Sequence, residues 1–100
     1  MLINGVNFPE KQIADFCARH SVKRLSIFGS ILRDDFRPDS DVDILVEFAD
    51  GKTPGMFGFG AMILELSKMT DRNVDLRTPF DLSRHFRPHI LSGARLLHAA

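Results

Sequence analysis

The stretch that decides the fold is residues 29–48, GSILRDDFRPDSDVDILVEF. Its second half alternates, with an apolar residue at every second position from Val42 to Phe48. Because successive side chains of a strand point to opposite faces, this pattern predicts a strand over Asp41 to Phe48 with one apolar face. Asp41 and Asp43 then lie together on the other face.

The first half of the stretch predicts a sharp turn between two strands. Lys23 to Phe28, KRLSIF, also alternates and runs directly into Gly29-Ser30, where a glycine allows the chain to turn. Ser30 to Arg33 has the length of one helical turn. Asp34 to Ser40 contains a proline and several Asp and Ser residues, which are typical of a loop.

Outward from this stretch, the spacing of apolar residues predicts the remaining elements. The expected order is a helix over Pro9 to His20, a loop over Ala49 to Gly60, a helix over Ala61 to Met69, a turn over Thr70 to Arg72, a strand over Asn73 to Thr78, a helix over Leu82 to Ser92 ended by Gly93, and a short strand through Leu96 and Leu97. This order predicts an α/β (α+β) fold, a small mixed β-sheet with helices packed on one face. The chain shows no repeat or linker, so we expect one domain over residues 1–100.

The composition excludes several classes of protein. With 44% hydrophobic and 26% charged residues, the chain has the balance of a globular domain rather than of a disordered or coiled-coil protein. Thirteen basic residues balance thirteen acidic ones, so nucleic-acid binding, which usually needs a basic surplus, is not expected. The lone Cys17 excludes an internal disulfide, the N-terminal stretch lacks a signal-peptide pattern, and no apolar run approaches the ~20 residues of a membrane span. We therefore expect a cytoplasmic protein without membrane contact.

Asp41 and Asp43 indicate a cation site. Their Cα atoms should lie about 6.6 Å apart along the strand, with roughly parallel side chains. Two carboxylates about 4 Å apart repel by roughly 4 kcal/mol near a protein surface, unless a cation or a shared proton lies between them. Mg²⁺ prefers carboxylate oxygens and completes its shell with water and substrate phosphates, so a nucleoside triphosphate is the expected ligand. Asp75 adds a third carboxylate on the polar face of its predicted strand.

Gly29 and Ser30 predict a phosphate-binding turn, because a glycine lets the backbone approach a ligand and the following N–H groups and hydroxyl can face anionic oxygens. Alone, a Gly-Ser pair is more often a simple turn, and an Asp-x-Asp on a strand is more often a solvated face. Their order along the chain favours a functional site: a Gly-Ser turn, ten residues, an Asp-x-Asp strand and then a later strand aspartate.

Residues 29–48, together with VDLRT at Val74 to Thr78, resemble the signature of the minimal nucleotidyltransferases, relatives of DNA polymerase β. The resemblance covers nearly the whole chain and implies a polymerase β-like nucleotidyltransferase fold. It also implies transfer of AMP from ATP to a hydroxyl of a partner protein. Small proteins of this type resemble the antitoxin of a toxin–antitoxin pair whose toxin is a HEPN-domain ribonuclease, modified on a tyrosine near its active site and thereby silenced.

The resemblance assigns roles to individual residues. Gly29 and Ser30 match the positions that hold the triphosphate. Asp41 and Asp43 match the metal ligands, and Asp75 matches the third acidic position, which helps to hold a second ion and promotes deprotonation of the incoming hydroxyl. Two Mg²⁺ ions about 3.5 to 4 Å apart would stabilise both the attacking and the leaving oxygens at the α-phosphorus.

Two further positions match the nucleotide-binding part of the signature, and one departs from it. Arg33 is retained, and Ser40 matches the serine before the first aspartate. Asp34 stands where the family often has glycine, and its negative charge near the phosphates could weaken nucleotide binding. This departure motivates an alternative, a non-catalytic binding module that neutralises its partner by occlusion.

The chain contains no tyrosine, so a tyrosine acceptor must belong to another chain. We expect the partner to be a HEPN-domain toxin, in a complex with this protein. A nucleotidyltransferase that acts on a small molecule is disfavoured, because 100 residues leave little material for an acceptor pocket.

Other conspicuous residues receive structural interpretations. His85 and His89 have the spacing of a helical zinc pair but no further ligand, so we favour a solvated basic helix face with Arg84 and Arg87, one that could contact an acidic partner.

Phe57 and Phe59 could stack on an adenine, but we favour a role as core anchors. Cys17 is expected to pack in the core rather than to act as a nucleophile. Arg77 shares a strand face with Asp75, so it either binds phosphate or neutralises the acidic cluster.

Overall fold

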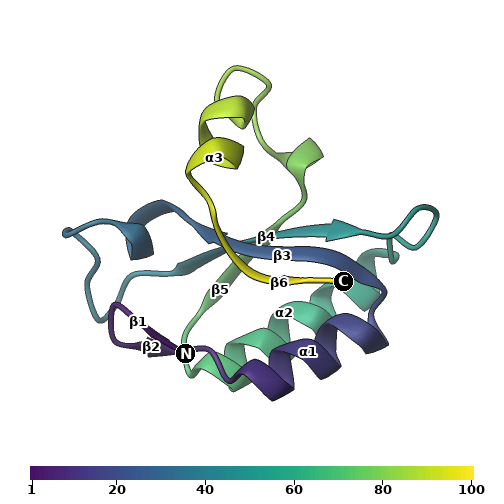
Figure 1. Cartoon of the computed structure of the whole chain (residues 1–100), viewed down its shortest axis with the longest axis horizontal. Helices are drawn as coiled ribbons and strands as arrows, with labels where there is room; N and C mark the ends of the chain where they lie inside the picture. The colour runs from purple at the N-terminus through teal and green to yellow at the C-terminus, as the bar shows by residue number, and fades with distance from the viewer.

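The computed structural model describes all residues, 1–100, and centres on a four-stranded sheet in the order β5–β4–β3–β6 (Figure 1). The strands are β3 (Val22–Phe28), β4 (Val42–Phe48), β5 (Val74–Arg77) and β6 (Arg95–Ala99). β3 pairs antiparallel with β4 and with β6, whereas β4 and β5 run parallel. The predicted mixed sheet is therefore confirmed, including all four of its strands.

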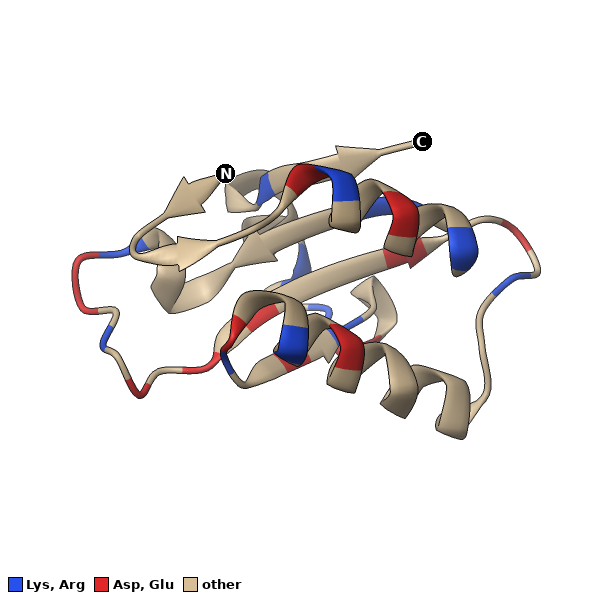
Figure 2. Cartoon of the chain, turned by 90° about the horizontal axis from the view of Figure 1, so that it is seen from below, with Lys and Arg blue, Asp and Glu red and all other residues tan.

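Two helices cover one face of this sheet. Helices α1 (Glu10–Arg19) and α2 (Met56–Thr70) lie below it in Figure 1, and Figure 2 shows them from their own side. Glu65 joins them, with Oε1 2.8 Å from Arg19 Nη2 and Oε2 3.3 Å from His20 Nε2. The core between helices and sheet contains 17 buried residues, among them Cys17, whose expected packing role is confirmed.

The third helix lies on the opposite side of the sheet. After β5 the chain forms a single 3-10 turn, η2 (Pro79–Asp81), and then helix α3 (Arg87–Gly93) before it returns as β6. We call this segment, residues 79–94, the C-terminal excursion; Figure 1 shows it projecting from the sheet on the side away from α1 and α2. The prediction of helices on one face thus holds for α1 and α2 but not for α3.

The prediction that Ala49 to Gly60 forms a loop is wrong at its C-terminal end, because α2 begins at Met56. Gly58 and Gly60 suggested a loop, but the apolar stripe that ends in buried Met62 and Leu66 packs on the sheet and outweighs their low helix propensity. The expected core role of the two phenylalanines here is correct only for Phe59, which packs against the core. Phe57 is 92% exposed on the first turn of the helix.

The predicted helix over Leu82 to Ser92 is also wrong in its first half. Leu82 and Ser83 are irregular, Arg84 to Phe86 form a turn, and α3 begins only at Arg87. Pro88 explains this boundary, since a proline lacks the N–H that a helix interior uses and fits only the first turn. Arg84 and His85 therefore lie outside the helix that carries Arg87 and His89, so the predicted basic helix face is wrong in its first half, although both residues are exposed as expected.

An N-terminal hairpin was not predicted. Strands β1 (Leu2–Ile3) and β2 (Val6–Asn7) pair antiparallel through a turn at Asn4 and Gly5, both of which have positive φ angles. A further 3-10 turn, η1 (Gly29–Leu32), follows β3 and corresponds to the helical turn predicted over Ser30 to Arg33. None of the helices has the length and apolar character required to cross a membrane.

Candidate active site

Asp43 and Asp75 lie side by side on neighbouring strands. In the parallel register of β4 and β5 their Cα atoms are direct partners. Val42 and Ile44, on either side of Asp43, are fully buried in the core, so Asp43 projects from the opposite face of the sheet. Both carboxylates are half-buried there.

Gly29 lies against Asp43 on the side of β3, opposite Asp75 on β5. It follows Phe28, the antiparallel partner of Asp43 on β3, and adopts a φ of 78°. A Cβ atom at this position would overlap Oδ2 of Asp43, so the carboxylate lies directly against the glycine backbone. A side chain here would be excluded twice, by the left-handed backbone conformation and by the carboxylate.

The surroundings raise the pKa of Asp43. Burial is the largest cause, because it removes water from the charged form, and the negative charge of Asp75 adds to it. Asp41 raises the pKa as well, whereas the nearby charges of Arg77 and Arg33 lower it. Asp43 is thus a carboxylate whose ionised form needs additional positive charge nearby.

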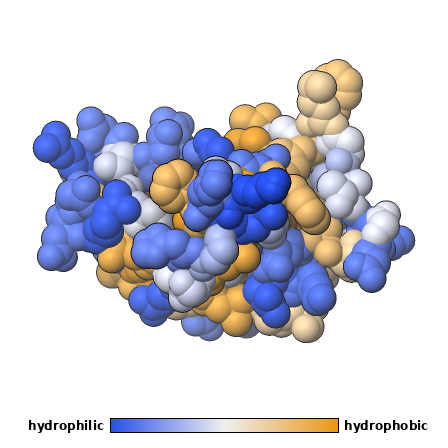
Figure 3. Space-filling model, turned by 90° about the horizontal axis from the view of Figure 1, so that it is seen from above, coloured by the Kyte–Doolittle hydropathy of each residue, from blue (hydrophilic) through white to orange (hydrophobic).

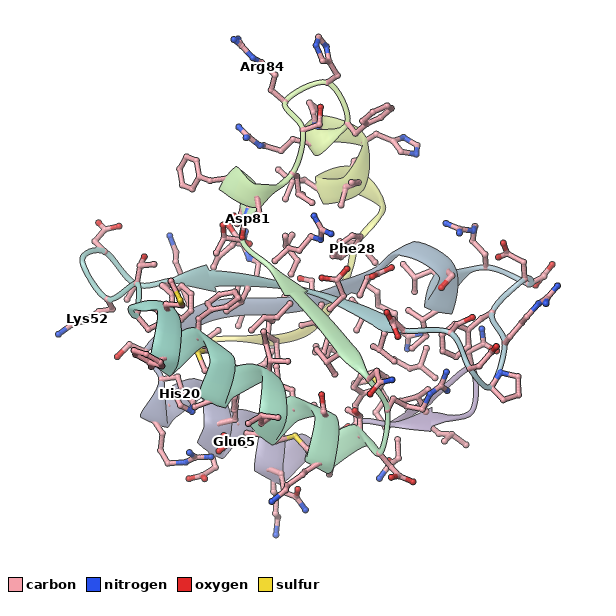
Figure 4. The ribbon with its side chains drawn as sticks, turned by 180° about the vertical axis from the view of Figure 1, so that it is seen from behind. His20, Phe28, Lys52, Glu65, Asp81 and Arg84 are labelled. Atoms are coloured by element: carbon pink, nitrogen blue, oxygen red, sulfur yellow. The ribbon has the colours of Figure 1, made fainter.

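The two acids open into a pocket of about 320 Å³ between the sheet and the C-terminal excursion. Its lining comprises Phe28, Asp43, Asp75, Arg77, Asp81, Leu82, Ser83, Phe86 and Ile90. Figure 4 shows Phe28 and Asp81 at this junction, with Arg84 at the far tip of the excursion. A larger open groove of about 780 Å³ runs along α2 and the loop at Pro38 to Ser40. It contains none of the three predicted acids, whereas the smaller pocket contains two of them, Asp43 and Asp75.

Asp41 lies at the edge of this site. It is exposed and immediately precedes β4. In the present conformation no group of three His, Cys, Asp or Glu side chains is close enough to hold a metal ion. Asp43 and Asp75 are therefore brought together by the sheet, while Asp41 would have to turn toward them.

The nucleotide-binding residues implied by the resemblance lie around the turn and the loop that follow β3. Ser30 is part of η1, and its carbonyl accepts a hydrogen bond from the N–H of Arg33 at 2.8 Å. The side chain of Arg33 pairs with Asp35, with Nε 3.1 Å from Oδ1. Ser40 Oγ accepts a bond from the N–H of Arg37 at 3.0 Å, so this hydroxyl faces its own loop.

Sequence reasoning missed two residues that hold these loops in place. Arg72 Nη2 donates to the carbonyls of Ser40 at 2.6 Å and Arg37 at 3.0 Å, and its guanidinium lies 4.6 Å from the ring centroid of Phe36. Asn4 Nδ2 donates to the carbonyl of Ile31 at 3.0 Å, inside η1. No local sequence pattern marks either residue, because both donate hydrogen bonds to carbonyls that are distant along the chain.

The donor atoms of the site fit a hard divalent cation. Asp43 and Asp75 offer only carboxylate oxygens, which are the ligands that Mg²⁺ prefers. Their mutual repulsion, together with the half-buried position of Asp43, makes a doubly charged ion favourable at this place. The site contains no thiol or imidazole that would favour a softer metal.

Comparisons with known proteins agree on one family. Residues 10–98 match the model of the family described as "Nucleotidyltransferase domain". The chain is 34% identical over 90 residues to "Putative protein adenylyltransferase MJ0435" of Methanocaldococcus jannaschii. The aligned region covers 90% of this chain and 95% of that protein.

Solved structures share the fold. One described as a "putative minimal nucleotidyltransferase" superposes with a TM-score of 0.70 at 32% identity and covers 85% of both chains. Another, a tri-AMPylated Shewanella oneidensis HEPN toxin in complex with MNT antitoxin, gives a TM-score of 0.64 at 22% identity, covering 91% of this chain and 70% of that one. With nearly its whole length matched by the family model and the paired acids of its sheet beside a glycine turn, the chain belongs to the nucleotidyltransferase domain family.

Proposed function

We propose that this protein transfers AMP from ATP to a hydroxyl of a partner protein, with release of pyrophosphate, in a Mg²⁺-dependent reaction. The proposed partner is a HEPN-domain toxin and the proposed acceptor a tyrosine of that toxin, so that the chain acts as an antitoxin. The name of the Methanocaldococcus relative supports protein adenylylation. The Shewanella complex supports the partner, since there an MNT antitoxin accompanies an AMPylated HEPN toxin.

The observation that carries this proposal is the register of Asp43 with Asp75, against the turn at Gly29. The strand pairing presents two carboxylates to one pocket, and the glycine brings backbone within reach of the same point. Backbone N–H groups at such a turn can donate hydrogen bonds to anionic phosphate oxygens.

Each residue has a proposed role at the α-phosphorus. Asp43, Asp75 and Asp41 would hold two Mg²⁺ ions, which would neutralise charge on the phosphates when bound. Asp75 would also accept the proton of the incoming hydroxyl. The turn at Gly29 and Ser30 would hold the triphosphate.

Arg33 and Ser40 are proposed to contact the nucleotide as well. Both side chains currently bond within their own loop, Arg33 to Asp35 and Ser40 to the N–H of Arg37. Their role therefore requires that these contacts exchange for contacts with phosphate, whose charged oxygens accept strong hydrogen bonds.

The test is to incubate the protein with α-labelled ATP, Mg²⁺ and the product of the neighbouring gene, which the proposal expects to be a HEPN-domain protein. We expect label on that partner, and loss of labelling when its acceptor tyrosine is replaced by phenylalanine. Asp43→Asn should reduce the rate by at least about a hundredfold, because it removes a metal ligand. Asp50→Asn, an exposed acid in the loop after β4, is the matched control and should react normally. Absence of label with folded protein would contradict the proposal.

Asp34 is the observation that favours the alternative, a non-catalytic module that neutralises its partner by occlusion. Its exposed carboxylate lies two residues after the end of η1, where a negative charge disfavours phosphate binding. If the protein neutralises its toxin by occlusion alone, Asp43→Asn will still protect cells that express the toxin. Adenylylation predicts that this variant loses protection, so one experiment in cells separates the two.

A further inference from the structure

Arg77 and Asp75 form an ion pair within the candidate active site. They lie two residues apart on β5 and therefore project from the same face. Arg77 Nε is 3.3 Å from Oδ1 of Asp75 and its Nη2 is 3.3 Å from Oδ2, so the guanidinium reaches both oxygens of the carboxylate. Both side chains line the pocket that also contains Asp43.

This pair is exposed enough to exchange readily. The side chains of Arg77 and Asp75 are 46% and 37% accessible, and ion pairs of this exposure contribute little to stability. A competing cation of higher charge at the same carboxylate can therefore replace the arginine without disturbing the fold.

Asp75 cannot serve Arg77 and a metal ion equally well at the same time. A guanidinium that spans both carboxylate oxygens takes part of their lone-pair sites, and its positive charge repels a second cation at the same carboxylate. Arg77 carries one positive charge, yet it faces a pocket that contains the carboxylates of both Asp75 and Asp43. A divalent cation neutralises this pair better, which favours displacement of the arginine.

The third acid of the pocket, Asp81, is already partly engaged in hydrogen bonds. Asp81 Oδ2 already accepts bonds from the N–H of Thr78 at 2.9 Å and from its hydroxyl at 3.1 Å, closing the cap of η2. A polyphosphate entering with the metal ion supplies the missing anion, because a planar guanidinium binds phosphate oxygens in the same forked manner as a carboxylate.

We propose that Arg77 is a resident counter-cation of this site: it neutralises Asp75 in the nucleotide-free protein, and the metal ion that enters with a nucleoside triphosphate displaces it onto the phosphates. This inference rests on the proposed function and adds a residue to it. Arg77 thus opposes metal binding in the absence of nucleotide and supports nucleotide binding in the presence of metal.

The experiment measures free Mn²⁺ by electron paramagnetic resonance, with and without a non-hydrolysable ATP analogue, for the wild type and Arg77→Gln. Arg77→Gln should bind Mn²⁺ alone about tenfold more tightly, because its competitor is gone, and should bind the analogue with Mn²⁺ about tenfold more weakly. Arg77→Lys should recover part of the analogue affinity, since it keeps the charge but loses the fork.

Arg24→Gln is the matched control. Arg24 pairs with Glu47 across β3 and β4 at 3.5 Å with a similar exposure, so the variant removes an equal charge from the same sheet, away from the pocket. It should leave both affinities within about twofold of the wild type, since exposed charges at a distance are screened.

The outcomes separate this inference from the proposed function. If Arg77→Gln binds Mn²⁺ alone no better than the wild type, or if Arg24→Gln shows the same gain, the counter-cation role is wrong even when the wild type labels its partner. If no form of the folded protein binds Mn²⁺ with the analogue, both the metal-dependent function and this inference are overturned.

Discussion

Gly29 packs its backbone directly against the carboxylate of Asp43, so closely that no side chain fits between them. The glycine closes β3 in a left-handed conformation and the aspartate projects from the paired strand β4. The turn that is proposed to hold phosphate and the acid that is proposed to hold the metal are thus parts of one contact.

Replacement of Gly29 by alanine should destabilise the protein by about 2–4 kcal/mol. About 1–2 kcal/mol comes from forcing a residue with Cβ into the left-handed region, and the remainder from displacing Asp43. Urea unfolding measures the total. Gly5→Ala provides the control, because Gly5 has a similar φ of 83° but open space around it. Equal losses in the two variants would show that the contact with Asp43 contributes nothing.

Asp43→Asn should raise the melting temperature at pH 7 although it slows transfer. The pKa of Asp43 is raised in the folded protein, first by burial and then by Asp75, so the folded state binds this proton more tightly than the unfolded state. Stability therefore falls as pH rises from the ordinary Asp pKa through the raised one, and the penalty is complete above it. Asparagine removes that penalty.

Thermal scans from pH 3 to pH 7 test the sign of this effect. The advantage of Asp43→Asn should be absent near pH 3, where both states hold the proton, and should be largest at neutral pH. Asp50→Asn should show no such trend. A variant advantage that grows toward acid pH would contradict the assignment.

Arg72→Ala should loosen the loop before Asp41 and slow transfer. The variant loses the bonds from the guanidinium to the carbonyls of Ser40 and Arg37, a loss of about 1–2 kcal/mol at this partly exposed position. Hydrogen exchange should show lower protection of the Ser40 amide, which itself bonds to Arg37. The Lys52 amide, bonded to Ala49 in another loop, should not change.

Cys17 should not react with thiol reagents in the folded protein. Burial raises the pKa of its thiol to about 11, so almost no thiolate exists at pH 8 and the reagent has no access. Mass spectrometry after treatment with iodoacetamide should find unmodified protein in buffer and one adduct in about 6 M guanidinium, which unfolds most stable domains. Rapid modification in buffer would show that α1 opens locally.

The sheet could be predicted from sequence because its strands carry their own signal. Val42 to Phe48 alternates with period two, and burial of its apolar side required no knowledge of distant residues. The same pattern placed Asp43 and Asp75 on the polar face. Their register, with one Cα opposite the other, depends on how β4 and β5 pair and was not contained in either strand alone.

The parts that failed depend on tertiary contacts. The first turn of α2 exposes Met56 and Phe57, so no amphipathic pattern marked its start, and Figure 2 shows this end of the helix without charged residues. The excursion around α3 exposes Phe80 and Phe86 beside arginines, and the space-filling view from that side mixes apolar and hydrophilic residues (Figure 3). Apolar residues in this segment therefore follow neither the helix nor the strand period, so its structure could not be predicted from their spacing.

The N-terminal hairpin offers an engineering handle on substrate affinity that is separate from the chemistry. Asn4 Nδ2 donates hydrogen bonds to the carbonyls of Ile31 and Arg33, at 3.0 and 3.2 Å, although Asn4 does not line the pocket. Substitutions at Asn4 would alter the stiffness of the turn beside Gly29 and hence the entropy lost when a ligand orders it. Graded affinity variants could therefore be made with every reacting group left intact.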